Sequence, residues 1–387
     1  MTNFNITPNR RKNFNLTKWT WYPKDVLPMW VADMDFPAPK PILDSLQKLL
    51  EHGVLGYELP GKVLYETVAK RMNDLYKWKI SHEAVIAVPG VMSGINVAAR
   101  VFCSDKKGLA VQTPVYNGFH EVKNNASVPQ VDIPFIKKVK GNIISYEIDW
   151  VTFEKQIKKT KIFLLCNPHN PLGIIFSRRE LIRMAEICIK HKVIIVSDEI
   201  HSELLLDKNK FTPIAKLSKE IEKNTITLIA ASKTFNVPGF FCAFAIIPNK
   251  ELRTVFEKEV HRLGLHVGSA GLHASKTAFS GVCDSWLKEL NRYLTANRNF
   301  LVEYVTKNMP NVKTTIPDAT YLGWLDFTET GIEKPYEFFL ENAKVALSDG
   351  NIFGKDGASH LRINFGTSRA LLQEGLNRMS KAMKSIK

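Results

Sequence analysis

The chain has 387 residues, of which 45% are hydrophobic and 24% are charged, and its formal net charge at pH 7 is +15. This length permits a large hydrophobic core and favours two domains. No apolar stretch reaches the roughly 20 residues of a membrane span, and residues 1–5 lack the apolar core of a signal peptide. The composition therefore predicts a globular protein with no membrane partner.

The positive charge raises the question of a nucleic-acid partner. The lysines are spread along the chain, however, and the sequence has no RNP-like segment, zinc-finger spacing or extended basic arm. We therefore expect a solvated, lysine-rich surface and no nucleic-acid partner. The ten histidines show no spacing typical of a metal site, so no metal is expected. The five scattered cysteines predict buried free thiols in a cytoplasmic protein.

The first half of the chain alternates apolar runs with helical patterns. Two amphipathic helices are expected between about Pro39 and Tyr76, separated near residues 53–57. Strands are then predicted at residues 108–113, 128–135, 162–166, 193–197, 225–231 and 240–247. One intervening helix begins with a capping box at Ser177 and Glu180. Such an alternation is typical of an α/β fold with a mostly parallel sheet covered on both faces.

The pattern changes after about Gly281. A long helix through Asn308 is followed by strands near Val312, Leu322 and Leu361 and by a closing helix from about Ser368. This order predicts a second, smaller α+β domain. We therefore divide the chain into an N-terminal segment (1–45) that contributes to the small domain and the functional site, a large domain (46–281) and a small domain (282–387).

Polar side chains follow three of the predicted strands. Asn170 comes after the run 162–166, Asp198 ends the run 193–197, and Lys233 follows the run 225–231. Taken alone, Asn170 is more typical of a turn, Asp198 of a strand end or helix cap, and Lys233 of an exposed surface position. In open α/β sheets, ligands bind beyond the carboxyl ends of the strands. An amide, a carboxylate and an amine at this edge are what pyridoxal phosphate (PLP) needs for its ring hydroxyl, ring nitrogen and aldehyde.

A phosphate site is expected at a helix that opens after Pro89 and Gly90. The backbone amides of Val91 and Met92 would point out of the helix N-terminus, where the macrodipole favours an anion. The hydroxyl of Ser232 could complete this site, and the ring of Tyr116, just beyond another strand, could stack on the cofactor. The alternatives are a loop serine and an aromatic residue that serves packing alone.

Together these segments resemble one family closely: the MalY/PatB branch of cystathionine β-lyases, carbon–sulfur lyases of the class I/II aminotransferase superfamily. The resemblance runs over nearly the whole chain. It rests on LPMWVADMDF at 27–36, NPHNP at 167–171, DEIH at 198–201, SKTFN at 232–236, TYLGWLDF at 320–327 and LRINF at 361–365. It implies the PLP-dependent transferase fold of type I, with a mostly parallel, seven-stranded-type sheet in the large domain and a smaller α+β domain.

The resemblance also implies roles for single residues. Lys233 would form a Schiff base with the cofactor and then act as the acid/base at the substrate α-carbon. Asp198 would pair with the ring nitrogen, and Asn170 would bind the ring oxygen. Other cofactor contacts carried over from the family are His201 at the ring oxygen, Tyr116 stacked on the ring, and Val91, Met92 and Ser232 at the phosphate.

The substrate would be bound by Arg362, which clamps its α-carboxylate, and by the segment around Ala32 and Asp33. Tyr57 matches a family tyrosine that reaches the phosphate of the neighbouring subunit, which implies a homodimer with shared active sites. The catalytic set implied by the resemblance is thus Lys233, Tyr57 and Tyr116.

The implied activity is PLP-dependent β-elimination of L-cystathionine or related cysteine S-conjugates to a thiol, pyruvate and ammonia. The sequence leaves two alternatives open. An aminotransferase would use the same lysine and arginine, and a regulatory protein would use the scaffold only to bind a partner. The intact lysine, aspartate and asparagine set argues against the loss of catalysis.

Overall fold

The computed structural model describes residues 3–5 and 14–385. Its core is a sheet of seven strands in the order β4-β3-β6-β7-β8-β9-β2. These strands are β2 (Val85–Val88), β3 (Leu109–Thr113), β4 (Gln130–Lys140), β6 (Ile162–Cys166), β7 (Ile194–Asp198), β8 (Thr225–Ile229) and β9 (Ala243–Ile246). Only β9 runs antiparallel to its neighbours in this set. The predicted, mostly parallel sheet is therefore confirmed, and β2 is a strand that the sequence analysis missed.

Burial on both faces explains why these strands read as continuous apolar runs. In β6, Leu164 packs in the same cluster as the helices α4 (Val91–Phe102), α5 (Asn117–Ala126) and α10 (Lys250–Arg262). Its neighbour Phe163 packs in another cluster with α6 (Trp150–Ile157) and α7 (Arg178–Lys190). Successive side chains of a strand point to opposite faces, so each strand needs apolar residues at every position.

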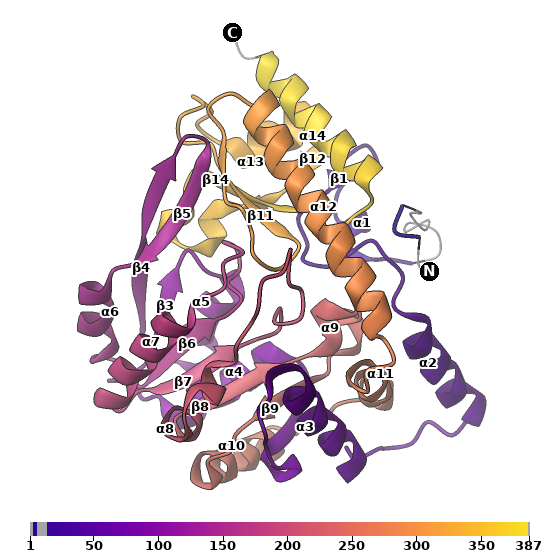
Figure 1. The fold of residues 1–387 in the computed structure, drawn as a ribbon, viewed down its shortest axis with the longest axis vertical. Coiled ribbons are helices and arrows are strands. Elements are labelled where there is room, and N and C mark those ends of the chain that lie inside the picture. The colour runs from indigo at the N-terminus through magenta and orange to yellow at the C-terminus, as the bar shows by residue number, and fades with distance from the viewer. Residues whose placement is uncertain (1–2, 6–13, 386–387) are drawn as a thin grey trace.

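The sheet continues beyond β4 through a long hairpin, which projects upward on the left of Figure 1. The second arm of this hairpin, β5 (Ile143–Ile148), pairs with β10 (Lys313–Thr314), and the order then runs to β11 (Leu322–Asp326), β14 (His360–Asn364) and β13 (Ser348–Asp349). Strand order is thus continuous from β2 to β13, and the boundaries at residues 45 and 281 stay a prediction.

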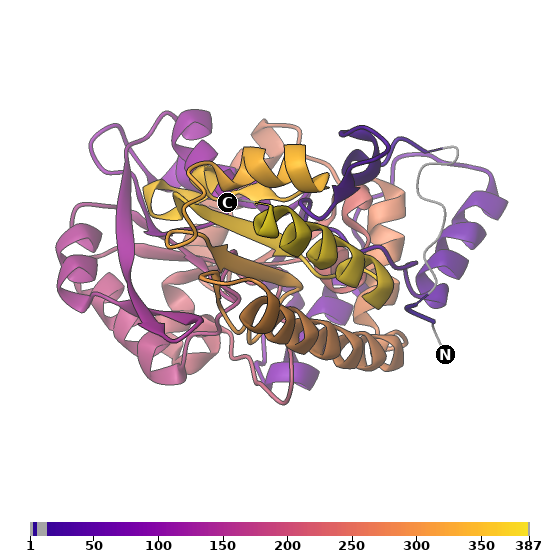
Figure 2. The same ribbon diagram turned by 90° about the horizontal axis from the view of Figure 1, so that it is seen from above.

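The C-terminal part carries two long helices, α12 (Asp284–Asn308) and α14 (Arg369–Lys384), which lie side by side in Figures 1 and 2. The N-terminal strand β1 (Leu27–Pro28) pairs with β12 (Val345–Ala346), so residues from both ends of the chain meet here. The remaining helices are α1 (Thr17–Thr20), α2 (Lys40–His52), α3 (Lys62–Tyr76), α8 (Lys219–Lys223), α9 (Ala231–Thr234), α11 (Ser269–Phe279) and α13 (Pro335–Phe338).

The predicted helices are found where the sequence placed them. The two helices between residues 39 and 76 are α2 and α3, and the capping box at Ser177 and Glu180 starts α7. The helix predicted through Asn308 is α12, and the closing helix is α14. In the part of the chain that the structure describes, no helix is long and apolar enough to cross a membrane.

The core of the sheet yields a stability prediction. Phe163 is fully buried in β6, and its ring meets that of Phe153 edge to face with centroids 5.1 Å apart. Phe163→Ala should lower the free energy of unfolding by about 3–5 kcal/mol, because it leaves a cavity that the packed layers cannot fill. Urea denaturation measures this loss. Val151→Ala, at an exposed position of the neighbouring helix α6, is the control and should change stability by less than about 0.5 kcal/mol.

Candidate functional site

The register of three parallel strands brings the predicted polar residues to one edge of the sheet. Asp198, the last residue of β7, is level with Cys166 of β6 and Leu228 of β8. Asn170 follows β6 by four residues in the sequence, and Lys233 lies in the short helix α9 just after β8. The carboxyl ends of the strands therefore present the amide, the carboxylate and the amine side by side.

The amine of Lys233 is held by the N-terminal segment. Its Nζ donates a hydrogen bond of 2.6 Å to the backbone carbonyl of Ala32. Burial lowers the pKa of Lys233 to about 8; the carboxylates of Asp33 and Asp198 oppose this shift, whereas the Arg362 guanidinium adds to it. Near neutral pH the lysine therefore carries far more free amine than an ordinary lysine, as a nucleophile or base requires.

Asp198 is a buried carboxyl group without a cationic side-chain partner. Its Oδ1 accepts a hydrogen bond of 3.0 Å from the backbone N–H of Ile200. Among the described residues, no lysine, arginine or histidine lies within ion-pair distance of its oxygens. Burial raises the pKa of Asp198 to about 6, whereas the N–H of Ile200 and the charge of Lys233 lower it. Such a carboxylate is available to a positively charged ligand group.

Arg362, in the middle of β14, is buried and points to the same edge. Its Nη1 donates to Oδ1 of Asn170 at 3.1 Å, and its Nη2 donates to the carbonyl of Trp30 at 2.8 Å and to Oγ of Ser348 at 3.1 Å. Its Nε has no hydrogen-bond partner. Burial lowers the pKa of Arg362 to about 10, so the guanidinium remains charged at neutral pH. The arginine is thus positioned beside Asn170 with an unused donor.

Tyr116 and His201 both lie near Arg362 and complete the group. The backbone N–H of Tyr116 donates to the carbonyl of Asn170 at 2.9 Å. Burial raises the pKa of the Tyr116 phenol; the charge of Arg362 opposes the shift and that of Asp198 adds to it. His201 is buried without a partner for its Nδ1, and burial, with the charges of Lys233 and Arg362, lowers its pKa to about 3. His201 is therefore neutral at physiological pH.

The predicted phosphate-binding residues lie at the start of α4. This helix begins at Val91, directly after Gly90, whose φ of +98° is a conformation that favours glycine. Gly118 lets the ring of Tyr116 approach this helix: a Cβ at position 118 would lie 2.5 Å from Cε1 of Tyr116 and 3.2 Å from Sδ of Met92. Ser232, in α9, is partly buried. Their role in anion binding stays a prediction.

The segment 31–36 is fixed over Lys233 by residues that the sequence analysis did not single out. Asn236 accepts from the N–H of Met34 at 3.0 Å and donates to the carbonyls of Met34 and Phe36 at 2.9 and 2.7 Å. Asn364 donates to the carbonyls of Val31 and Asp33 at 2.5 and 2.6 Å. Both asparagines lie in the motifs SKTFN and LRINF. Their place in these motifs could have pointed to such a role, because an asparagine amide can both donate a hydrogen bond to a backbone carbonyl and accept one from a backbone N–H.

Two further side chains support this segment. The hydroxyl of Tyr321 donates to the carbonyl of Ala32 at 2.8 Å, so this oxygen is shared with Lys233. Lys18 is almost fully buried and lies 3.6 Å from the Asp33 carboxylate and 3.2 Å from that of Asp35. Burial raises the pKa of Asp33, and the charge of Lys18 opposes the shift. The predicted substrate segment at Ala32 and Asp33 therefore lies beside Lys233.

Tyr57 is the one predicted site residue that the structure leaves apart from this group. It is fully exposed in the segment between α2 and α3. Several other apolar side chains nearby are also exposed, namely Leu50, Val54, Leu55, Leu59 and Val63. Within one chain, Tyr57 therefore does not contact the residues around Lys233.

The described residues contain no group of three or more histidine, cysteine, aspartate or glutamate side chains that could hold a metal ion.

Comparison with known proteins identifies relatives of the whole chain. Residues 29–379 match the model of the family "Aminotransferase class I and II". The cystathionine beta-lyase PatB of Bacillus subtilis is 36% identical over 367 residues, which cover 93% of each chain. The crystal structure of cystalysin from Treponema denticola, which contains a PLP cofactor, has a TM-score of 0.94 at 30% identity, and the match covers 100% of both chains. A PLP-bound C–S lyase from Staphylococcus hominis has a TM-score of 0.91 at 28% identity, covering 99% of this chain and 98% of that chain.

The pKa of Lys233 gives a test of the buried amine. Because this pKa falls from 10.5 to about 8, the folded chain binds fewer protons than the unfolded chain between these pH values. The contribution of Lys233 to stability should therefore rise as the pH increases through this window. Urea denaturation of the ligand-free chain and of Lys233→Met, compared from pH 7 upward, measures it, with a limit of about 1.4 kcal/mol per pH unit. A difference that does not change with pH would contradict the assignment.

Proposed function

The chain belongs to the class I and II aminotransferase family, and we propose that it is a PLP-dependent carbon–sulfur lyase. Its substrate is L-cystathionine or a related cysteine S-conjugate. The reaction breaks the bond between the β-carbon and sulfur and, with one water molecule, yields a thiol, pyruvate and ammonia. The observation that carries this proposal is the meeting of Lys233, Asp198 and Arg362 at one sheet edge, in a chain 36% identical to a cystathionine beta-lyase.

The residues at this edge fit PLP. Asp198 is a buried carboxylate that lacks a cationic partner among the described residues, and a protonated pyridine nitrogen would supply one. The Nδ1 of the buried His201 has no hydrogen-bond partner in the protein. It is therefore free to bind a ligand. Asn170 and His201 would bind the ring oxygen, Tyr116 would stack on the ring, and Val91, Met92 and Ser232 would hold the phosphate.

PLP, when bound, supplies a ring that withdraws electrons from the substrate α-carbon. Asp198 would keep the ring nitrogen protonated, which would strengthen this withdrawal. Lys233 would hold the cofactor through its aldehyde carbon and, once released by the substrate amine, would take the α-proton at its Nζ. A pKa of about 8 suits this role, because the base is then poised near the working pH.

Arg362 binds and orients the substrate. The planar guanidinium matches a carboxylate with two parallel hydrogen bonds, and its Nε is an unused donor in the present arrangement. The segment at Ala32 and Asp33 would form the wall of the pocket that receives the sulfur substituent. Tyr116, whose pKa is raised by burial, stays protonated and can donate its proton to the departing sulfur.

We propose further that the protein is a cytoplasmic homodimer with shared active sites. Exposed apolar side chains gather between α2 and α3 around Tyr57, and Phe241 is exposed as well. A second copy of the chain would cover these side chains and bring Tyr57 to the phosphate of its neighbour. The five cysteines are free, and four of them are buried, which supports a reducing compartment.

The lyase reaction has a direct test. Purified protein loaded with PLP should release pyruvate and a thiol from L-cystathionine. Lys233→Ala should abolish this activity and the yellow colour of the bound cofactor. Arg362→Ala should lower kcat/KM by about 100-fold, because the loss of a hydrogen-bonded charge pair costs about 1.5–3 kcal/mol. Arg178→Ala, at an exposed position in α7, is the matched control and should leave kcat/KM unchanged.

Two results would contradict the proposal. Keto acid that forms only when an amino acceptor is supplied would identify an aminotransferase. A yellow protein that releases no pyruvate from any sulfur amino acid would favour a purely regulatory protein.

The shared active site can be tested by mixing two inactive variants. Tyr57→Ala and Lys233→Ala each damage a different component of the site. If Tyr57 acts across the dimer, half of the randomly reassembled dimers contain one intact site of two, so activity should recover to about a quarter of the wild-type value. Pyruvate release after unfolding and joint refolding measures the recovery. If Tyr57 acts within its own chain, the mixture will stay as inactive as its parents.

A further inference from the structure

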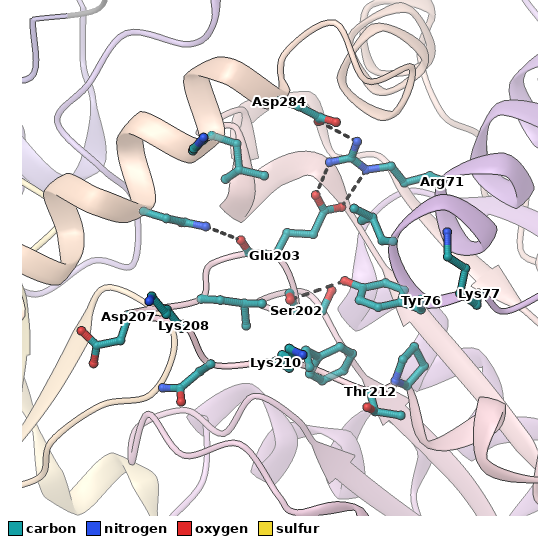
Figure 3. Close-up of a pocket in the computed structure, with 18 of the residues that line it drawn as sticks. Arg71, Tyr76, Lys77, Ser202, Glu203, Asp207, Lys208, Lys210, Thr212 and Asp284 are labelled. Carbon is teal, nitrogen blue, oxygen red and sulfur yellow. Dashed lines mark hydrogen bonds and ion pairs between the residues drawn. The ribbon is translucent and has the colours of Figure 1, made fainter.

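A large groove lies apart from the site around Lys233. Its volume is about 1520 Å³, and it is enclosed by the end of α3, by segment 202–216 and by the first part of α12 (Figure 3). None of the residues proposed to bind PLP or substrate lines it. The groove therefore has no part in the proposed reaction.

The inner surface of the groove is apolar. Tyr76 and Phe211 are buried there with their rings edge to face, at a centroid distance of 5.6 Å. The Tyr76 hydroxyl donates to the carbonyl of Ser202 at 3.4 Å, as Figure 3 shows. Leu75, Leu205 and Leu287 extend this surface. It can accept the face of a ring-shaped group.

The acidic side chains in the groove are already paired with arginines. Arg71 is buried between Glu203 and Asp284, with 2.6 Å between its Nη1 and Oδ1 of Asp284 (Figure 3). Asp207 is paired with Arg298 at 2.5 Å. Two arginines thus offset two of the three negative charges, and the one that remains is outnumbered by the cations at the rim of the groove.

The basic side chains at the rim of the groove, by contrast, are exposed and are not paired with carboxylates in the described part of the chain. The exposed cations that line the groove are Lys77, Lys208, Lys210, Lys216, Lys288 and Arg292. For none of these six does the described part of the chain provide a carboxylate within 4.0 Å. They come from three separate parts of the chain, and Lys77 and Lys208 lie on opposite sides of the groove in Figure 3. An anion in the middle would be attracted from several directions.

We propose that this groove binds a small organic polyanion of the chemical class of nucleoside di- and triphosphates. The phosphate groups pair with the lysines and Arg292 at the rim, and the base packs on the apolar surface at Tyr76 and Phe211. The opposed arrangement of the cations favours a compact anion enclosed between two walls over an acidic polypeptide laid on a flat surface.

The test uses ATP and the PLP-loaded protein, in which the cofactor already occupies the other phosphate site. Isothermal titration calorimetry should detect one ATP per chain, with inorganic triphosphate as a weaker competitor. Lys208→Ala/Lys210→Ala should weaken ATP binding at least about tenfold, because two charge-assisted contacts are lost. Lys288→Glu/Arg292→Glu, on the α12 wall, should weaken it further. The control Lys381→Ala/Lys384→Ala removes the same charge from exposed positions of α14 and should bind ATP normally.

Circular dichroism and pyruvate release from cystathionine verify that each variant is folded, since none of these residues belongs to the proposed catalytic site. The absence of ATP binding, or equal affinity in all variants, would overturn the proposal. Tight binding of a poly-glutamate peptide that ATP does not displace would overturn it in favour of a polypeptide partner. The titration needs no turnover, so its outcome is independent of whether the lyase assignment holds.

Discussion

The alignment of β6, β7 and β8 is the constraint on which the site depends. Cys166, Asp198 and Leu228 are level across these strands, so the loops that follow them leave the sheet at one edge. Hydrogen bonds of the parallel ladder fix this register, and a shift by one residue would turn Asp198 to the opposite face. The polar groups of the site are thus placed by a framework of buried apolar residues that takes no part in chemistry.

Burial then gives the side chains at this edge unusual pKa values. The same removal from water lowers the pKa of Lys233 to about 8 and raises that of Asp198 to about 6. Lys233 therefore carries more free amine near neutral pH than an ordinary lysine, while Asp198 is still mostly ionised at pH 7. Arg362 is affected as well, but its ordinary pKa is so high that it keeps its charge. One physical cause therefore prepares a base, an anion and a cation at the same edge.

Much of this arrangement could be predicted because it depends on local sequence. Buried parallel strands read as apolar runs, and the polar residues that follow them mark the edge where ligands bind. The contacts that hold residues 31–36 could not be derived in this way. Asn236 and Asn364 bond to backbone atoms about 200 and 330 positions away in the chain, and no local pattern predicts such pairs. β2 was missed because it has only four residues before Pro89.

Apart from the Asp33 and Asp35 carboxylates, which lie beside Lys18, the attachment of residues 31–36 uses main-chain atoms. Asn236, Asn364 and Tyr321 contact backbone N–H and carbonyl groups of this segment. Every amino acid offers the same backbone groups, apart from the missing N–H of proline. Side chains at positions 31 and 32 can therefore change during evolution, and with them the sulfur substituents that the site accepts, while the segment keeps its place. Variants from a laboratory library randomised at positions 31 and 32 should likewise keep this segment in place.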